Sequence, residues 1–421
     1  MTSMKPIINE KTRQWRPDGH SQTTTIMKGG QSYYRPIPMP HAPVFPVADF
    51  SEFKLWGIRQ PSQFDAPHLD HFIAARYALF AALKDMECQA GDEILIPAYH
   101  CKAMIYPVLK AGGRPVFYKV REDLSADLDD LETKLSRHTK AALYVSYFGF
   151  FRDIEKFRAF CNSHNLLMIE DCAHALFGHN NGIATGSFGD YAIGSVKKFL
   201  PVSLGGILTS RKVLKRGLAR RRPALQENIK FFYNTLERSA QYGRHTGVGH
   251  LVHLLEKFRR PAAPPASADL PVTPESQDME NRFIDEKANH YPPLVTYWAE
   301  RLCHQKRLVQ KRRENYQRLL NHVKGMAQLR PLLPQLPDGV VPYMFPLALD
   351  NLERVFPFLE DGGLPLQRFG QFLWPDKTVA ACRNSLFWSR HVLQLPCHQG
   401  LKSEEIDWMI ETVLRCLDEA A

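Results

Sequence analysis

The feature that most constrains the fold is the alternation of short apolar runs with helix-like segments. Apolar runs occur at 93–97, 115–118, 141–145 and 166–170. The segments beside them have the length and periodicity of helices, and they are 72–83, 102–109, 127–135 and 154–164. Strands separated by helices of about ten residues are typical of βαβ units, so we predict an α/β fold with a mostly parallel sheet. A site in such a sheet lies beyond the carboxyl ends of the strands.

The rest of the chain divides into segments of different composition. Residues 1–60 are rich in Pro, Thr, Gly and aromatic residues, so we expect a largely irregular arm that packs on the main body or on a partner subunit. Residues 61–258 form the predicted large domain, and a Pro/Ala/Ser-rich stretch within 259–292 predicts a linker. Residues 293–421 are expected to hold a long helix over 293–323 and a smaller α/β domain.

The formal charge of +10 is concentrated in two groups of basic residues. The first, 211–222, is expected to form a basic helix after a strand at 207–209, and the second, 306–313, has Leu and Val at helical spacing. Such runs are most often solvated helix faces. The functional alternatives are an anionic substrate such as a nucleotide diphosphate, an acidic carrier protein or an anionic membrane surface. No zinc finger or RNA-binding aromatic motif is present, so nucleic acid is not an expected partner.

The same composition predicts a cytoplasmic protein. No run of about 18 apolar residues is present, and the polar N-terminus has no apolar stretch typical of a secretory signal. The eight cysteines lie far apart, with no C-x-x-C and no Cys/His pair at zinc spacing, so we expect reduced thiols and no metal.

One candidate site segment is Ile169–Ala175, which contains Asp171 and His174. Asp171 comes just after an apolar run, where a site residue of a parallel sheet belongs. A carboxylate there can hold a pyridine nitrogen protonated. The alternative is an aspartate that caps the N-terminus of a helix, and the residue by itself does not decide between the two.

A second candidate is Lys198, which follows Gly186–Asp190 and precedes Gly205-Gly206. A lysine that forms a Schiff base must lie on a rigid element and point into a dry pocket, where its pKa falls. The apolar residues and glycines after Lys198 predict a tight turn between strands. Taken alone, Lys198 could equally be a surface lysine.

Together and in this order, the two segments resemble the DegT/DnrJ/StrS family of sugar aminotransferases, which are fold-type-I pyridoxal phosphate (PLP) enzymes. The matching segments are Gly91–Pro97, Gly113–Phe117, Phe148-Gly149, Glu170–Ala175, Gly186–Asp190, Lys198–Gly206, Arg312–Tyr316 and Leu395–His398. The resemblance implies a large PLP-binding domain with a smaller C-terminal α/β domain, and a homodimer with the active site at the subunit interface.

The resemblance also assigns roles. Lys198 corresponds to the Schiff-base lysine and to the general acid/base that moves the substrate's proton, with Lys197 as the second choice. Asp171 corresponds to the partner of the pyridinium, and His174 to the residue beside the cofactor's phenolic oxygen. Ser195, together with backbone N–H groups of the helix near Ala75 and Arg76, is the candidate for the phosphate.

Three departures from the family pattern change the expected site. The family has Ser-Gly-Thr where this chain has Ala74–Arg76, so Arg76 is a candidate ligand of the phosphate. Strict spacing puts Cys101 where an aromatic residue usually stacks on the cofactor, and His100 or Tyr99 is a candidate to take over that contact. The segment through which a partner subunit reaches the active site has no clear match, although Arg244-His245 lies in that region.

We therefore expect an aminotransferase that moves an amino group from a donor, Glu or Gln by resemblance, to a keto acceptor of the nucleotide-linked ketosugar class. One alternative is a PLP-dependent dehydratase or another PLP reaction, although family members that dehydrate sugars have lost the lysine. Another is a non-catalytic PLP fold that acts as a binding or regulatory protein. The arm at 1–60 is expected to cover the interface or the pocket.

Overall fold

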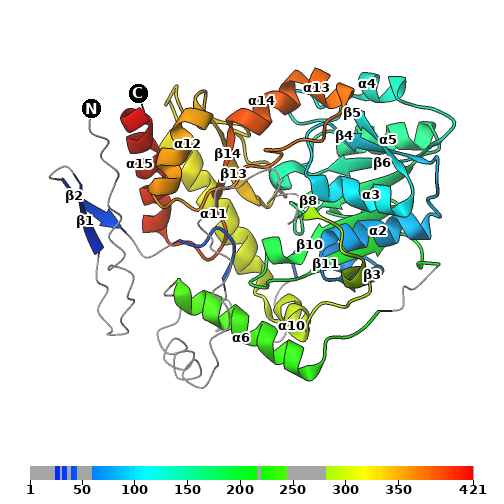
Figure 1. Cartoon of the computed structure of the whole chain (residues 1–421), viewed down its shortest axis with the longest axis horizontal. Helices are drawn as coiled ribbons and strands as arrows, with labels where there is room; N and C mark the ends of the chain where they lie inside the picture. Colours follow the sequence, from blue (N-terminus) through cyan, green and yellow to red (C-terminus); the bar gives the residue numbers. More distant parts are fainter. Residues whose placement is uncertain are drawn as a thin grey trace, which may run out of the picture.

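The structure is a computed structural model that describes residues 39–44, 59–215, 220–242, 244 and 281–420, together with the backbone of 24–28 and 31–35. It consists of a large α/β body and a group of C-terminal helices around a small sheet (Figure 1). The expected α/β class is confirmed.

A seven-stranded sheet forms the centre of the large body. Its spatial order is β3-β11-β10-β7-β6-β4-β5, with the bounds β3 His68–Phe72, β4 Glu93–Pro97, β5 Arg114–Tyr118, β6 Thr139–Val145, β7 Leu167–Cys172, β10 Tyr191–Ser195 and β11 Gly206–Ser210. The strands β5, β4, β6, β7 and β10 are parallel, and β11 and β3 complete the sheet in antiparallel pairing. The carboxyl ends of the five parallel strands therefore share one edge.

Helices cover both faces of this sheet, which explains why its strands are continuous apolar runs. On one face, α2 (Ala75–Asp85) and α3 (Ile105–Ala111) pack together, and α2 also contacts β10 and β11. On the other face, α5 (Ile154–Ser163) lies over β6 and β7. A short helix, α4 (Leu128–Thr133), follows β5, and a two-stranded pair, β8 (His179–Asn180) with β9 (Ile183–Ala184), follows β7.

The C-terminal part is built on an antiparallel sheet in the order β12-β13-β14. Its strands are β12 (Arg330–Pro331), β13 (Met344–Ala348) and β14 (Val392–Pro396). The helices of this part are α11 (Gln305–Val323), α12 (Leu352–Asp361), α13 (Lys377–Ala381), α14 (Arg383–His391) and α15 (Ser403–Ala420). Because α15 packs on both α11 and α12, the last hundred residues form the small α/β unit that the sequence predicts.

Two expected helices differ from the structure. The helix expected over 293–323 is two helices, α10 (Leu294–Leu302) and α11, because Cys303 has extended backbone and His304 caps α11 by accepting the Arg307 N–H at 3.1 Å. The basic helix does not begin after residue 209: residues 211–215 are not helical, and α6 spans Leu225–Gln241. The Arg211 side chain instead donates to the carbonyl oxygens of Phe188 and Gly189, which holds that segment on the sheet edge.

The arm and the linker are described only in part. The backbone of 24–28 and 31–35 forms an antiparallel pair, β1 with β2, so this piece of the arm is not irregular. Residues 39–44 pack on the body, with Met39 and Val44 buried. Residues 259–280 of the expected linker, and His245, lie outside the described residues; residues 281–292 include the short helix α9 (Asp285–Ala288). Within the described part of the chain, no helix is long and apolar enough to cross a bilayer.

Candidate active site

The strands β7 and β10 bring the two candidate segments together. They are parallel neighbours, and Asp171 lies beside Ile193 in their register. The chain leaves β10 at Ser195 and makes one turn of 3-10 helix, Val196–Lys198, before returning along β11. The expected tight turn between strands is therefore present. Lys198 lies close enough to influence the pKa values of Asp171, His174 and Cys101, so these four residues form one electrostatic cluster.

Asp171 is a buried carboxylate at the end of β7. Burial raises its pKa, while a hydrogen bond from the Ala173 N–H to Oδ1 at 2.8 Å and the charge of Lys198 lower it. This arrangement combines the two alternatives raised by the sequence. Oδ1 accepts the backbone N–H of the following turn, as a capping aspartate does, and the carboxylate also interacts electrostatically with Lys198.

The side chain of His174 is held as a neutral ring with a defined tautomer. Burial and the positive charge of Lys198 lower its pKa well below the usual value. The backbone N–H of Phe148 donates to Nδ1 at 3.3 Å, so Nδ1 is the acceptor and Nε2 carries the proton. The ring is stacked on Tyr343, with centroids 4.6 Å apart, and on Phe148 at 5.8 Å. His174 therefore presents an N–H donor from a fixed orientation.

The Phe148 N–H that bonds to His174 comes from a strained turn. Phe148 has φ of 56° and ψ of 12°, a left-handed conformation that is unusual for a bulky residue. The next residue, Gly149, has φ of 99°, and a Cβ added there would lie 2.4 Å from the Val341 carbonyl oxygen. The Phe-Gly pair is thus required by close contact between the large body and the segment before β13.

Lys198 and Lys197 differ clearly in placement. Lys198 is partly buried, and its Nζ lies 5.0 Å from the centre of the Tyr343 ring. Lys197 is exposed, and its charge lowers the pKa of His41 in the arm, after the larger effects of burial and Arg238. The two neighbouring lysines therefore point to different surroundings, and only Lys198 joins the cluster with Asp171 and His174.

The two glycines after Lys198 attach its turn to the N-terminus of α2. Gly205 donates to the Ile73 carbonyl oxygen at 2.9 Å and accepts from the Val196 N–H at 3.0 Å. A Cβ on Gly206 would lie 2.4 Å from the Ala75 nitrogen, so only glycine fits there. The N-cap residue, Ala74, makes no side-chain capping bond. The N–H groups at the start of α2 are thereby placed beside the lysine turn, where they can bind an anion.

The other predicted phosphate residues lie around the same helix end. Ser195 is buried on β10 and pairs with Gly206 across the sheet. Arg76 is partly buried, donates to the Arg282 carbonyl oxygen at 3.0 Å, and lies close enough to lower the pKa of Cys101. The structure therefore places Ala75 and Arg76 on α2 and Ser195 on β10, the two elements that meet β11 at Gly206.

The structure engages His100 and Tyr99 in other contacts. His100 is fully buried, its Nδ1 is 3.1 Å from the Pro97 carbonyl oxygen, and its Nε2 accepts the Trp374 N–H at 3.0 Å. Burial lowers its pKa to about 4. Tyr99 packs among Tyr147, Phe369 and Trp388, and burial raises its pKa. Both residues thus pack the large body against the C-terminal part.

Cys101 differs from its two neighbours. It is partly exposed, and its thiol lies within electrostatic range of Lys198, Arg76 and Asp171. Burial, the largest effect, raises the pKa of this thiol. The Cys101 thiol therefore lies with the candidate site residues, at the position that the spacing of the sequence indicates.

Two site residues were not assigned roles from the sequence. The Tyr343 ring contacts both His174 and Lys198. No motif around this tyrosine in the sequence indicates these contacts. Arg312 is fully buried, and its guanidinium donates to the carbonyl oxygens of Lys198 (2.9 Å), Pro342 (3.1 Å) and Tyr343 (3.2 Å) and to Gln399 Oε1 (3.0 Å). The Arg312–Tyr316 motif could have indicated importance, but only the fold shows that it holds the lysine turn.

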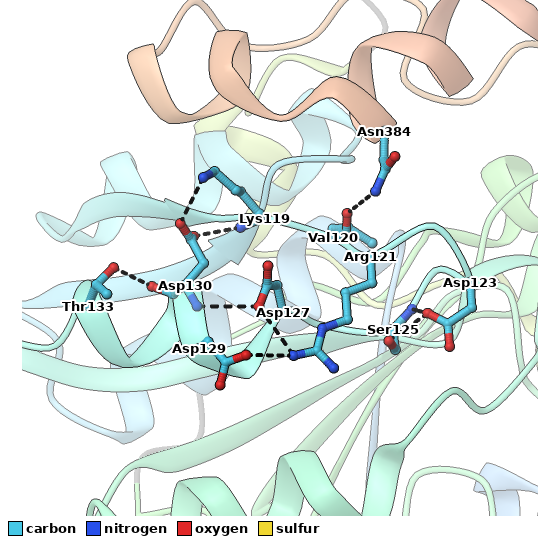
Figure 2. A network of polar contacts seen from close by, with 10 residues as sticks. All are labelled: Lys119, Val120, Arg121, Asp123, Ser125, Asp127, Asp129, Asp130, Thr133 and Asn384. Atoms are coloured by element: carbon cyan, nitrogen blue, oxygen red, sulfur yellow. Dashed lines mark hydrogen bonds and ion pairs between the residues drawn. The ribbon is translucent and has the colours of Figure 1, made fainter.

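A separate hollow of about 360 Å³ lies where the loop after β5 meets α13 and α14. Figure 2 shows its polar network, in which Asn384 donates to the Val120 carbonyl oxygen at 3.0 Å. Lys119 pairs with Asp130 at 3.5 Å and Arg121 with Asp129 at 2.9 Å. Neither Lys198 nor Asp171 lines this hollow, and Lys119 and Arg121, two of its three cations, already have carboxylate partners, so we do not assign it as the cofactor site.

The central segment of the chain is similar to a known family. Residues 71–213 match the model of the DegT/DnrJ/EryC1/StrS aminotransferase family. Over 136 residues the chain is 32% identical to a GDP-perosamine synthase of Vibrio cholerae, covering 32% of this chain and 37% of that protein. It is 36% identical over 129 residues to a UDP-N-acetyl-3-dehydro-alpha-D-glucosamine 3-aminotransferase of Acidithiobacillus ferrooxidans, covering 30% and 34%. The match thus spans about a third of the length of these relatives.

Solved structures resemble a larger part of the chain, at lower identity. The aminotransferase PseC of Helicobacter pylori, involved in the biosynthesis of pseudoaminic acid, aligns with a TM-score of 0.59 and 17% identity over 89% of this chain and 95% of that chain. A putative sugar aminotransferase of Streptococcus pneumoniae gives a TM-score of 0.59 and 18% identity over 91% and 98%. At these identities the likeness establishes the fold, which is the fold expected from the sequence.

Proposed function

We propose that the chain is a divergent member of the DegT/DnrJ/EryC1/StrS aminotransferase family, whose model matches residues 71–213, and that it is a PLP-dependent aminotransferase. The observation that carries the proposal is the cluster of Lys198, Asp171 and His174 beside the uncapped N-terminus of α2. PLP, when bound, supplies an aldehyde for amines and an electron-withdrawing ring.

The residues present fit this cofactor in charge and in hydrogen bonding. A buried carboxylate at Asp171 suits the protonated nitrogen of a pyridinium ring, since an unpaired buried charge is costly. The Nε2–H of His174 suits the phenolic oxygen, because its tautomer is fixed as a donor. The N–H groups at the start of α2, with Arg76 and Ser195 nearby, suit a phosphate. Lys198 supplies the amine that holds the aldehyde carbon.

Each residue then has a chemical task in amino transfer. Asp171 keeps the pyridine nitrogen protonated, and His174 donates a hydrogen bond without changing its own charge. Lys198 would hold the cofactor through its amine, and the same amine would serve as the general acid/base that removes and returns the substrate's proton. Tyr343 and Phe148 hold the His174 ring and exclude water from it.

The contact with the cofactor ring is assigned to Cys101. His100 and Tyr99, the sequence candidates for this contact, have other partners, and His100 uses both ring nitrogens. A thiol beside the ring can make a favourable sulfur–aromatic contact. It is smaller than an aromatic side chain and would cover less of the cofactor ring.

The substrate class comes from the relatives. Because the matching proteins include a GDP-perosamine synthase and an aminotransferase named for a UDP-linked sugar, we take the acceptor to be a nucleotide-linked ketosugar. The donor is expected to be Glu or Gln. The net charge of +10 is favourable for an anionic acceptor. The eight cysteines are all free, which supports a reducing, cytoplasmic setting.

We also take the chain to act as a homodimer, as the family resemblance implies. One chain has a mass of 48.2 kDa. Light scattering of the purified protein at working concentration should give twice this mass. A monomer would contradict this part of the proposal.

The test of the proposed function is spectroscopic. Purified protein with PLP should show a visible absorption band that disappears when borohydride reduces the Schiff base and leaves the cofactor covalently attached. Lys198→Ala should abolish this band, while Lys197→Ala retains it. The protein loaded with the amine form of the cofactor should then regain the band when the correct keto acceptor is added. A colourless wild-type protein in the presence of PLP would contradict the enzyme assignment, and a band lost only in Lys197→Ala would contradict the choice of lysine.

The alternative functions are less well supported by the site. Loss of the lysine is the expected mark of a sugar dehydratase in this family, and here Lys198 is in place. A non-catalytic binding protein has no need for a buried carboxylate, a fixed histidine tautomer and a strained turn in one cluster.

A further inference from the structure

The first half of helix α6 leaves its apolar residues exposed. Leu225, Ile229 and Phe232 follow one another at helical spacing, and all three are exposed, Leu225 by 74%. The buried residues of this helix, Thr235 and Ser239, lie in its second half. A helix that packs on its own protein along its whole length buries its apolar face, so the first half of α6 has an apolar face without cover among the described residues.

The neighbouring helix α10 continues the same surface. Leu294, Trp298 and Leu302 are spaced four residues apart and are exposed, Trp298 by 52%. The rings of Phe232 and Trp298 meet edge to face with centroids 6.3 Å apart, so the two apolar rows join. In Figure 1, α6 lies along the lower edge of the molecule with α10 beside it. We call these six residues of the two helices the α6–α10 face.

Basic residues surround the α6–α10 face. Residues 220–242 and 294–307 contain eight Lys or Arg against three Glu, a net formal charge of +5. Two of the three glutamates are already ion-paired, Glu227 with Arg221 at 3.0 Å and Glu300 with His71 at 2.8 Å. Five of the cations are exposed, and they are Arg221, Arg222, Lys230, Arg301 and Lys306.

From this geometry we propose that the α6–α10 face binds an anionic membrane surface. Exposed Trp, Phe, Leu and Ile side chains enter the boundary between headgroups and acyl chains, while surrounding Lys and Arg contact anionic headgroups. A second copy of the chain fits less well, because a two-fold contact would place one basic rim against another. The proposal goes beyond the proposed function and does not depend on it.

The test is flotation of the full-length protein with lipid vesicles. The protein should float with phosphatidylcholine vesicles that contain phosphatidylglycerol, bind phosphatidylcholine alone much more weakly, and lose binding as salt is raised. Trp298→Ser and Phe232→Ser should each weaken binding about tenfold, and Lys230→Glu with Arg301→Glu by at least as much. Absorption of the protein with added PLP should be unchanged in all of these variants.

The matched control is Phe387→Ser. Phe387 is exposed by 38%, almost the same as Phe232 at 39%, but it lies on α14 at the opposite end of the molecule in Figure 1. Its replacement should leave vesicle binding unchanged.

Three results would overturn the proposal. The first is wild-type protein that does not float with anionic vesicles, and the second is equal loss of binding in Phe387→Ser. The third is a dimer that Trp298→Glu or Ile229→Glu converts to monomers by light scattering, because the face would then be covered by a second copy.

Discussion

Arg312 donates a hydrogen bond to the carbonyl oxygen of Lys198 at 2.9 Å, and so the lysine turn is held from the C-terminal part of the chain. The Arg312 guanidinium also lies over the Phe199 ring, 4.4 Å from its centre, and donates to Gln399. Gln399 in turn donates to the Phe199 carbonyl oxygen. The turn that carries Lys198, the proposed Schiff-base lysine, is therefore fixed by residues more than a hundred positions away.

Replacing Arg312 with Gln should lower the free energy of unfolding by about 3 kcal/mol, because buried carbonyl oxygens lose their donor. The substitution should also shift the pH at which the visible absorption band of the PLP complex titrates. A loss of stability that left the Lys198 turn in place would not shift this pH. Arg312→Lys, which keeps the charge, should recover part of that titration. The control is Arg313→Gln, since Arg313 is more exposed and bonds to loop residues away from Lys198, the carbonyls of Pro337 and Val340 and the carboxylate of Asp338. Equal effects of the two glutamine variants would contradict the role of Arg312.

Gly206→Ala should abolish or greatly weaken cofactor binding. The new Cβ would meet the backbone of Ala74 at 2.2 Å, so the N-terminus of α2 must move away from the lysine turn. Titration with PLP, followed by absorption, should show at least about a tenfold rise in Kd. Gly362→Ala is the control, because its Cβ would meet the end of the Thr412 side chain at 3.1 Å. Normal PLP affinity in Gly206→Ala would show that α2 does not bind the phosphate.

Cofactor should protect Cys101 from alkylation. Two of the eight cysteines, Cys101 and Cys303, are partly exposed, and the other six are buried. With PLP at about ten times its Kd, iodoacetamide should modify Cys101 about tenfold more slowly, while the rate at Cys303 stays the same. Peptide mass spectrometry reads both sites in one sample. An unchanged rate at Cys101 would mean that its thiol does not line the cofactor site.

The stability of the protein should fall in mild acid partly through His100. The pKa of His100 is about 4 in the folded protein against an ordinary value of 6.5, so the unfolded chain takes up this proton first. The contribution of neutral His100 to the free energy of unfolding is therefore complete above pH 6.5. It is lost as the pH falls toward 4, by about 3 kcal/mol in total. His100→Gln, which keeps a donor and an acceptor, should show a shallower acid dependence in denaturant titrations. The same slope as wild type would contradict this assignment.

His174→Gln should retain most of the PLP band, and His174→Phe should shift it. An amide can donate to the same oxygen as Nε2–H, whereas a phenyl ring keeps the stacking on Tyr343 without a donor. The band position of the three proteins, recorded at one pH, separates the two contributions. Identical spectra would show that the ring makes no polar contact with the cofactor.

Much of the candidate site could be predicted from patterns of residues close together in the sequence. Strand runs such as 93–97 are continuous because both faces of the sheet are covered, and the order of Asp171, His174, Lys198 and the two glycines follows the edge of that sheet. Contacts between distant segments were not predictable. No local pattern shows that Trp374 occupies Nε2 of His100, or that Tyr343 stacks on His174. The break at Cys303 was missed because a periodic apolar pattern continues across it.

The contact between His398 and the arm has a consequence for how the chain matures. His398 Nε2 lies 2.8 Å from the Pro40 carbonyl oxygen, and the Gly400 N–H donates to Nδ1 at 3.2 Å, so Nε2 is the donor to the arm. During synthesis on a ribosome, Pro40 emerges more than three hundred residues before its partner. Residues 39–44 thus cannot make this contact until the C-terminal part has been synthesised, so they reach their native position late in folding.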